Sequence, residues 1–363
     1  MQTNPDTEDV NKPPTTPKPP HLEKHREFRM SDLARLAGVS KSTVSRALAD
    51  SPLVNAETKA RIKAIADAHN YRLNQAARNF RLKESLMIGV LIPSARHADW
   101  RISDPFFLEL VGGIADAMTD KGHELLLSRA RAQSGDWIRH FVDARRTDGV
   151  ILLGQGLEHD EINAIGERYS RLVVWGAPAP DQTYTTVGSD NEMGGYVATR
   201  HLIEQGKRRI AYIGNTSLPE ADLRYAGYRR ALEEFGIDYD DRLLQVPDNT
   251  FDAGFDAARH LLRSGVEFDG LFAFSDLYAI EAIKAFREAD IKVPGDIGVV
   301  GYDDLEIASY YHPSLTSIRQ DRQEGGRLLV ESLLGRIAGE PIEARLLPTP
   351  IVIRESSIAQ PRL

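Results

Sequence analysis

The sequence of 363 residues contains no cysteine, which excludes disulfides and a thiolate zinc site. It also lacks an apolar run long enough to cross a bilayer, and its proline-rich N-terminus lacks the apolar stretch of a secretion signal. We therefore expect a cytoplasmic protein with no membrane contact. The sequence has no Gly-x-Ser-x-Gly elbow, phosphate-binding loop or paired-histidine spacing, so we predict no catalytic residue, cofactor or metal.

Positive charge is scarce outside one segment of the chain. The net charge is −8, yet residues 24–83 hold 13 Lys and Arg against 5 Asp and Glu, which leaves the rest of the sequence acidic. A basic segment joined to a long acidic one is typical of a DNA-binding domain attached to a domain of another kind. Residues 1–27 are rich in proline and nearly free of apolar side chains, so we expect a disordered tail there.

Residues 30–48 have the pattern of two short helices that meet at Gly38, which is a helix-turn-helix. Five apolar residues recur at helical spacing and should pack the two helices together: Leu33, Leu36, Val39, Val44 and Leu48. Ser40 should cap the second helix through the amide of Ser42 or Thr43. The start of such a second helix reaches base edges in the major groove, which predicts these DNA contacts: Ser40, Lys41, Ser42, Thr43 and Arg46. The alternative is an ordinary helical hairpin with a solvated basic face.

A third helix should follow, with Asn55 capping it through Thr58 and with Ile62, Ile65 and Ala66 on its apolar face. We call residues 28–73 the head. Residues 74–84 contain a helical stretch too short to be stable alone, and we interpret this segment as a hinge that folds only when docked. Phe80 in it is either a wedge that enters DNA or a plug that packs on the remainder of the protein, and the neighbouring arginines favour the wedge.

Residues 85–363, the body, alternate short β-rich runs with helical periodicity, which predicts a doubly wound α/β fold. We expect strands buried on both faces at 86–92, 124–128, 149–153, 172–175, 209–214, 270–274 and 297–301, with further strands at 315–319 and 346–352. So long a segment suggests two lobes, one from about 86–189 and 321–347 and the other from about 190–317 and 348–358. The segment Gly188–Asp190 is a predicted crossing point. Two lobes joined by several crossovers suggest a hinged cleft for a small ligand.

Several side chains of the body are candidates to bind that ligand. Arg224 can hold hydroxyls or a carboxylate through its planar fork, and Asp303 follows a predicted strand at the edge where open α/β sheets bind ligands. Phe106 and Phe107 could stack on a sugar, although one of them can equally belong to the core. A surface ion pair is the alternative for Arg224, and capping or packing is at least as well supported for six weaker candidates: Trp175, Asp190, Asn249, Ser275, Asp276 and Arg322.

The sequence resembles the LacI/GalR family of bacterial transcription regulators from about Phe28 to Ser357. The resemblance rests on the segments Leu33–Ser40 and Thr43–Arg46 in the head, on Ala76–Arg78 in the hinge, and on body landmarks in family order: Asp104–Phe107, Arg146–Ile151, Gly188–Asn191, Gly206–Ala211, Arg224–Tyr228, Val300–Asp304 and Ile353–Ser356. It implies a helix-turn-helix head, a hinge helix, and a two-lobed effector-binding and dimerisation domain similar to periplasmic sugar-binding proteins. It also implies hinge contacts to DNA from Asn74, Ala77, Arg78 and Phe80.

Three positions depart from the family pattern. Phe80 stands where the family usually has a leucine, Leu73 replaces the usual proline before the hinge, and Asn249 occupies a position where several members have an aromatic ring. The resemblance implies a homodimer that binds a pseudo-palindromic operator and represses sugar-utilisation genes under control of a small effector. A tetramer, a non-sugar effector such as a nucleobase, and corepression or activation stay open. A solute-binding protein and an enzyme with an appended DNA-binding head are the rival interpretations, and the basic head argues against the first.

Overall fold

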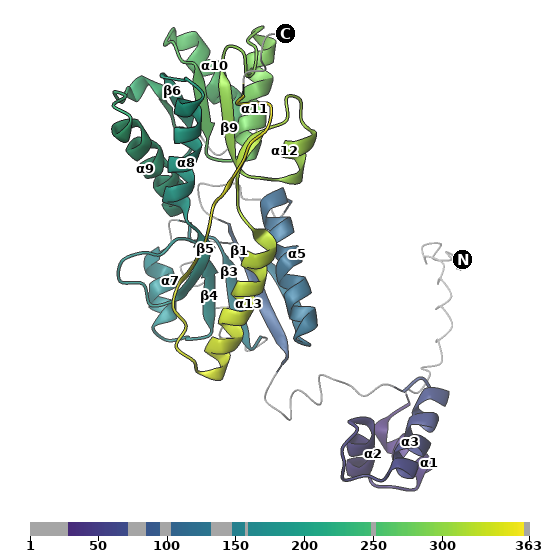
Figure 1. Cartoon of the computed structure of the whole chain (residues 1–363). Helices are drawn as coiled ribbons and strands as arrows, with labels where there is room; N and C mark the ends of the chain where they lie inside the picture. The colour runs from purple at the N-terminus through teal and green to yellow at the C-terminus, as the bar shows by residue number, and fades with distance from the viewer. Residues whose placement is uncertain are drawn as a thin grey trace, which may run out of the picture. The chain divides into compact units, whose positions relative to one another are not determined.

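The structure is a computed structural model that describes residues 28–71, 85–94, 103–131, 147–156, 159–247 and 252–358. The chain divides into two compact units, with the boundary between Leu82 and Lys83, inside the segment predicted to be the hinge. The first unit contains the head and the second is the body (Figure 1).

The head consists of three helices, α1 (Met30–Ala37), α2 (Lys41–Leu48) and α3 (Ala56–Ala68). Gly38 ends α1 in the left-handed region with φ of 65°, the conformation that glycine adopts without strain. The amide of Thr43 donates to Ser40 Oγ, and that of Thr58 to Asn55 Oδ1, so both predicted caps are confirmed.

The core of the head lies where the three helices meet. Leu33, Val44 and Ile62 are fully buried in it, with Val39, Leu48 and Ile65 packed at its edge. The predicted packing role of Leu36 is wrong, because this side chain is 49% exposed. It follows Leu33 at helical spacing, yet it lies roughly 110° from the centre of the face that Leu33, Ala34 and Ala37 bury.

The first lobe of the body is built on a parallel six-stranded sheet in the order β11-β5-β4-β3-β1-β2. Its strands are β1 (Met87–Ser94), β2 (Glu124–Arg131), β3 (Gly149–Leu153), β4 (Leu172–Trp175), β5 (Thr185–Ser189) and β11 (Arg345–Leu347). Helices α5 (Pro105–Asp120) and α13 (Arg322–Ala338) cover one face, and α7 (His159–Gly166) covers the other.

The second lobe repeats this plan with the strand order β12-β10-β9-β8-β6-β7, in which only the β10–β12 pair is antiparallel. Its strands are β6 (Ile210–Ile213), β7 (Leu244–Gln245), β8 (Gly270–Ala273), β9 (Gly298–Asp303), β10 (Thr316–Arg319) and β12 (Ile351–Val352). One face packs on α8 (Asn191–Glu204) and α9 (Pro219–Glu234), and the other on α10 (Ala253–Ser264) and α11 (Asp276–Glu288). The short α12 (Glu306–Tyr310) follows β9, and a 3₁₀ turn, η1 (Asp241–Leu243), precedes β7.

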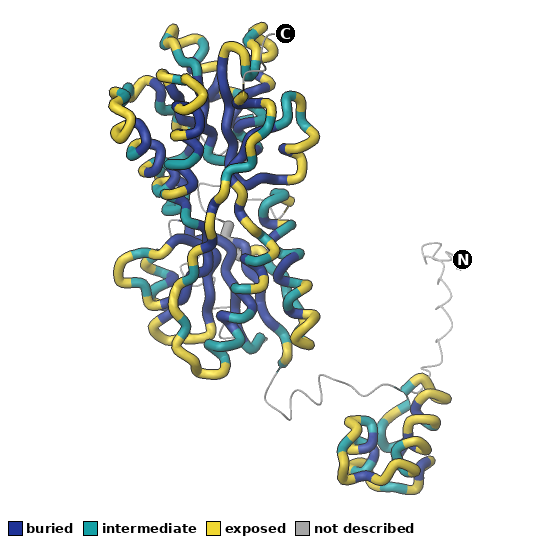
Figure 2. The backbone as a smooth tube through the Cα atoms, in the orientation of Figure 1, coloured by how far each residue is buried: buried dark blue, intermediate teal, exposed yellow. Residues whose placement is uncertain are grey.

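The chain passes between the lobes three times, from β5 to α8, from β10 to α13 and from β11 to β12 (Figure 1). In both lobes the central strands form the buried interior and the helices carry the exposed residues (Figure 2). The predicted α/β fold of two doubly wound lobes is confirmed.

Three predictions about strands need correction. Residues 185–189 form β5, although no strand was expected there and the predicted crossing at Gly188–Asp190 overlaps its end. The run 346–352 is two strands in different sheets, because Pro348 and Pro350 cannot donate to a ladder. Strand β2 is at the sheet edge with Glu124 and Arg129 exposed, so it is not buried on both faces.

Candidate functional site

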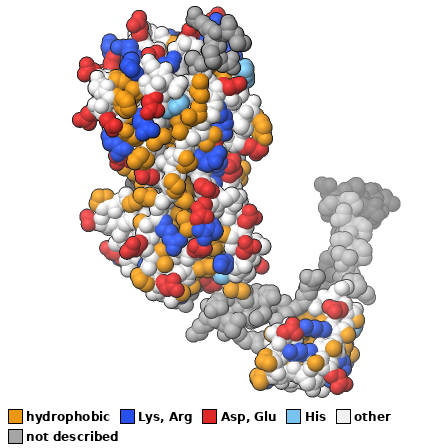
Figure 3. Space-filling view, viewed as in Figure 1, with side chains coloured by type: hydrophobic (Ala, Val, Ile, Leu, Met, Phe, Trp, Pro, Cys, Tyr) orange, Lys and Arg blue, Asp and Glu red, His pale blue; other side chains and the backbone are white. Residues whose placement is uncertain are grey.

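The exposed side of α2 carries the residues predicted to read DNA. Lys41, Ser42 and Arg46 are exposed, while Val44 and Ala47 on the opposite side are buried in the core of the head. Thr43 is half-buried, and its hydroxyl lies 2.9 Å from Ser40 Oγ. Ser42 Oγ is 2.7 Å from the same oxygen, so the cap engages these hydroxyls. Lys41 and Arg46 therefore present the long cationic donors of this surface, and Lys and Arg side chains gather on the head in Figure 3.

Five predicted site residues lie outside the described residues. They are Asn74, Ala77, Arg78 and Phe80 of the hinge, and Asn249 of the body. Their roles stay predictions.

A cavity of about 470 Å³ lies between the two lobes of the body. The first lobe lines it with residues from the start of α5 and from the ends of β3, β4 and β5. The second lobe contributes the starts of α8, α9 and α11 and the end of β9. The carboxyl ends of parallel strands and the N-termini of helices therefore meet there, which is where α/β sheets bind ligands.

Aromatic rings line the cavity from both lobes. Phe106 and Trp175 belong to the first lobe, with ring centroids 6.0 Å apart, and Phe107 packs edge-on against Phe106. Phe107 and Trp175 are mostly buried in the core of this lobe, so only Phe106 is a half-buried ring. Phe274 and Tyr278 line the second lobe with centroids 4.7 Å apart. Flat apolar faces from both sides suit a ring-shaped ligand.

Arg224 of α9 lines the cavity and is nearly fully buried. Its Nε donates to Asn191 Oδ1 at 2.8 Å and its Nη1 to the carbonyl of Phe274 at 2.6 Å. The guanidinium carbon lies 3.7 Å from the ring centroid of Tyr302, and Nη1 is 3.9 Å from Asp303 Oδ1. These contacts fix the guanidinium at the cavity wall.

Asp303 ends β9 with a backbone φ of 113°, and Asp304 follows with φ of 53°. Both lie in the left-handed region that non-glycine residues rarely adopt, a form of strain that is common at binding sites. Asp303 Oδ1 accepts from Gln320 Nε2 at 2.7 Å, while no described residue donates to Oδ2. Burial raises the pKa of Asp303 to about 6, although Arg224 and the hydrogen bond from Gln320 act to lower it.

Three predicted binding residues do not line the cavity. The carboxylate of Asp190 caps α8 by accepting from the amide of Met193. Arg322 forms an ion pair with Glu109 and donates hydrogen bonds to the backbone carbonyls of Asp303, Asp304 and Gln320. These bonds stabilise the strained backbone at Asp303 and Asp304.

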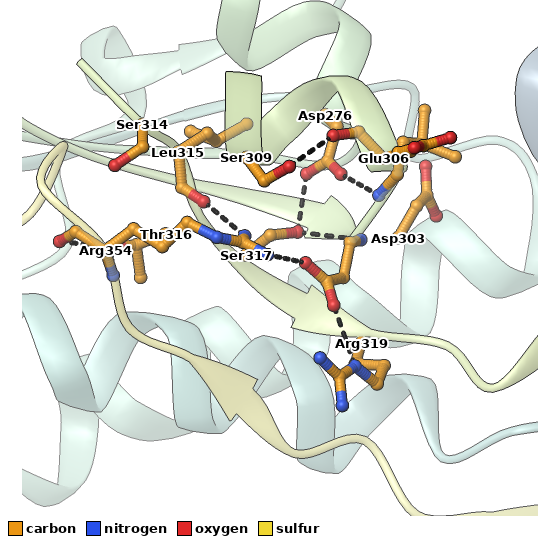
Figure 4. Close-up of polar contacts among 12 residues, drawn as sticks. Asp276, Asp303, Glu306, Ser309, Ser314, Leu315, Thr316, Ser317, Arg319 and Arg354 are labelled. Carbon is orange, nitrogen blue, oxygen red and sulfur yellow. Dashed lines mark hydrogen bonds and ion pairs between the residues drawn. The ribbon is translucent and has the colours of Figure 1, made fainter. Parts of the chain in front are cut away.

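Asp276, the third, is fully buried and accepts from Ser317 Oγ at 2.5 Å and from the amide of Leu305 at 2.7 Å. Burial and the nearby Asp303 raise its pKa well above the usual range. Next to it, Asp304 accepts from Arg319 Nε at 2.7 Å and Arg354 Nη2 at 2.6 Å. Figure 4 shows Asp276 and Ser317 facing each other, and Arg319 and Arg354 converging beside them. This network joins β9, β10 and the C-terminal strand region.

Several lining residues were not predicted: Ser103, Asp104, Ser189, Asn191, Glu220, Tyr278, Glu281 and Gln320. The position of Asp104 at a helix start could be predicted from sequence, because an acidic residue before Pro105 is typical of the first turn of a helix. Ser275 was predicted and lines the cavity, where its hydroxyl caps α11. The others come from different lobes, and no local spacing connects them.

Within the described ranges, no three His, Asp or Glu side chains are grouped as a metal site requires. Among the described helices, none combines the length and apolar character needed to cross a membrane.

Comparisons with known proteins match both units. Residues 29–74 match the model of bacterial regulatory proteins of the lacI family, and residues 199–357 match the periplasmic binding protein-like domain. The HTH-type transcriptional regulator CelR of Thermobifida fusca is 32% identical over 92% of this chain and 100% of its own. The ribose operon repressor of Escherichia coli K12 is 34% identical over 90% of this chain and 99% of its own.

Solved structures agree with these relatives. The lac repressor dimer bound to operator and the anti-inducer ONPF has a TM-score of 0.82 and 27% identity, covering 92% of this chain and 100% of that chain. The complex of the regulator CelR with cellobiose has a TM-score of 0.67 and 29% identity, covering 91% of this chain and 99% of that chain.

Proposed function

The chain belongs to the lacI family of bacterial regulatory proteins, and we propose that it is a cytoplasmic repressor of sugar-utilisation genes whose body binds the controlling sugar. One observation carries this proposal. A single chain joins a helix-turn-helix with exposed Lys41 and Arg46 to a two-lobed body with a cavity between its lobes. The first feature supports DNA binding and the second supports control by a small molecule.

On DNA, Lys41 and Arg46 contact base edges from the N-terminal part of α2, and Ser40, Ser42 and Thr43 contact the backbone or bases beside them. The hinge residues Asn74, Ala77, Arg78 and Phe80 enter the minor groove, with Phe80 as the wedge. A short hinge helix is marginal alone, so a coupling of about 1–3 kcal/mol from the body is enough to switch it.

The effector occupies the cavity between the lobes. Asp303 Oδ2 accepts a hydrogen bond from a hydroxyl of the ligand. Arg224 lies beside the ligand, and Phe106 packs against the apolar face of the ligand. Two relatives support a sugar, since one is named for the ribose operon and another was solved with cellobiose. In the body, Asp276, Asp190 and Arg322 act as supports of the binding residues and do not contact the ligand.

A homodimer provides two heads for a two-fold operator. Exposed apolar side chains support an interface on α5 and α12: Leu108, Ile307 and Tyr310. The two helices lie on the same side of the body in Figure 1. The solved lac repressor dimer on its operator is the relative that supports this arrangement.

The experiment is a gel-shift titration of the purified protein on DNA from upstream of its own operon, repeated with ribose and cellobiose. We expect a specific complex at nanomolar protein whose affinity changes when the effector is added. Binding no tighter than to scrambled DNA would refute the repressor, whereas turnover of a sugar would favour the enzyme.

A further inference from the structure

Carboxyl groups outnumber cations around the cavity. Four of its described lining residues are acidic, namely Asp104, Glu220, Glu281 and Asp303, and Arg224 is the one basic residue among them. Asp104 belongs to the first lobe and the other three to the second, so the excess of carboxyls extends to both walls. Burial raises the pKa of each of these four carboxyls, because each loses hydration without a full complement of positive partners.

Several of the donors that could hold an anion are already engaged. Helix N-termini usually supply free amides to a phosphate, but the amide of Phe106 at the start of α5 donates to Asp104 and that of Gly254 at the start of α10 donates to Glu281. Helix α11 is capped by Ser275, and α9 begins with Pro219, which has no N–H, followed by Glu220. Arg224 donates to Asn191 and to the carbonyl of Phe274.

An acceptor is left over instead. Asp303 is 7% exposed, lines the cavity, and receives no hydrogen bond at Oδ2 from any residue within the described ranges. This oxygen reaches the cavity, where a donor on the ligand can replace water. The rings of Phe274 and Tyr278 also line the cavity, and the face of an aromatic ring attracts positive charge more than negative charge.

We propose that the cavity selects its ligand by charge: it binds a polyol that offers hydroxyl or ammonium donors and excludes the phosphorylated or carboxylated derivative of the same polyol. This inference rests on the proposed role of the cavity as the effector site. A ligand hydroxyl or ammonium satisfies Asp303 Oδ2, whereas an added anion meets four carboxyls and a single cation among the described lining residues.

The test compares matched ligands by thermal shift and calorimetry on the full chain. The sets are ribose with ribose 5-phosphate, glucose with glucosamine and glucose 6-phosphate, and cellobiose with cellobionate. We expect at least one neutral or amine member to bind, and its anionic partner to bind at least about tenfold more weakly. An anionic member that binds more tightly than its parent overturns the inference, as does a panel in which no neutral or amine member binds.

Variants separate charge from shape. Glu281→Gln keeps an oxygen for the amide of Gly254 and removes one charge. We therefore expect the ratio of neutral-ligand affinity to anionic-ligand affinity, the anion penalty, to shrink about threefold to tenfold. Glu288→Gln, an exposed residue on the same helix, makes the same charge change and should leave the penalty unaltered. An equal effect of both variants contradicts selection by the cavity. Operator binding by the same samples reports separately on the proposed function.

Discussion

Replacing Asp303 by asparagine should stabilise the body at neutral pH while removing its response to the effector. The wild-type carboxyl is buried and its pKa rises from 3.8 to about 6. The folded state therefore holds this proton more tightly than the unfolded state does. As pH rises from about 4 to 6, the unfolded state gives up the proton first, and the folded state loses stability relative to it.

The size of this effect follows from the pKa. A shift of about 2 pKa units corresponds to about 3 kcal/mol at pH 7.5, which is an upper bound on what the variant can regain. Asparagine can still accept from Gln320 Nε2, so we expect the free energy of unfolding to increase by about 1–3 kcal/mol at pH 7.5 and by nearly nothing at pH 4. The effector loses its carboxylate acceptor, so its affinity should fall by tenfold or more.

The assay is urea unfolding followed by circular dichroism at both pH values, with effector titration on the same samples. Asp238→Asn is the matched control, because Asp238 is an exposed aspartate in the same lobe and its replacement changes the charge without a change in burial. A variant that is less stable than wild type at pH 7.5, or a gain equal at both pH values, would show that burial of the Asp303 carboxyl does not destabilise the folded state at neutral pH.

The remaining predictions concern both units. Arg46→Ala should cost about 1–3 kcal/mol of operator affinity and relax specificity at one base pair, measured by fluorescence anisotropy, whereas Arg61→Ala on the exposed side of α3 should reduce affinity without changing specificity. Arg224→Met should lower effector affinity by at least tenfold in calorimetry and leave operator affinity unchanged, and a parallel loss of DNA binding would contradict the separation of roles. Gly195→Ala places a Cβ 2.0 Å from the carbonyl oxygen of Arg224 and should lower the free energy of unfolding by about 1–3 kcal/mol, while Gly112→Ala, with nothing within 4 Å, should raise it by up to about 1 kcal/mol. Tyr310→Asp should shift the protein toward monomer in sedimentation velocity, and an unaltered dimer would place the interface elsewhere.

Local sequence signals predicted the local structure of this chain. The caps at Ser40 and Asn55 and the turn at Gly38 depend on neighbouring residues, so their residue types were sufficient. Leu36 was misplaced because spacing alone does not say which side of a short helix faces its partners. Strand β5 is hard to predict because Thr185, Thr186 and Gly188 interrupt the apolar run that marks the other buried strands.

The cavity required contacts between distant parts of the chain. Arg224, Asp303, Phe106, Phe107, Trp175 and Ser275 were predicted and do line it. Asp276 is one of the weaker candidates, and its carboxylate turns inward to Ser317 and Leu305. Glu220 and Glu281 reach the cavity only because α9 and α11 begin at its wall, which no spacing within the sequence reveals.

One chain is expected to bind a two-fold DNA site, and a ligand in the cavity is expected to change this binding. DNase I footprinting on DNA from upstream of its own operon, with and without the neutral sugar that binds most tightly, measures both properties. We expect a symmetric protected site whose occupancy changes with the sugar in the wild type and does not change in Asp303→Asn. An absent footprint, or a footprint that the sugar alters equally in both proteins, would contradict the account.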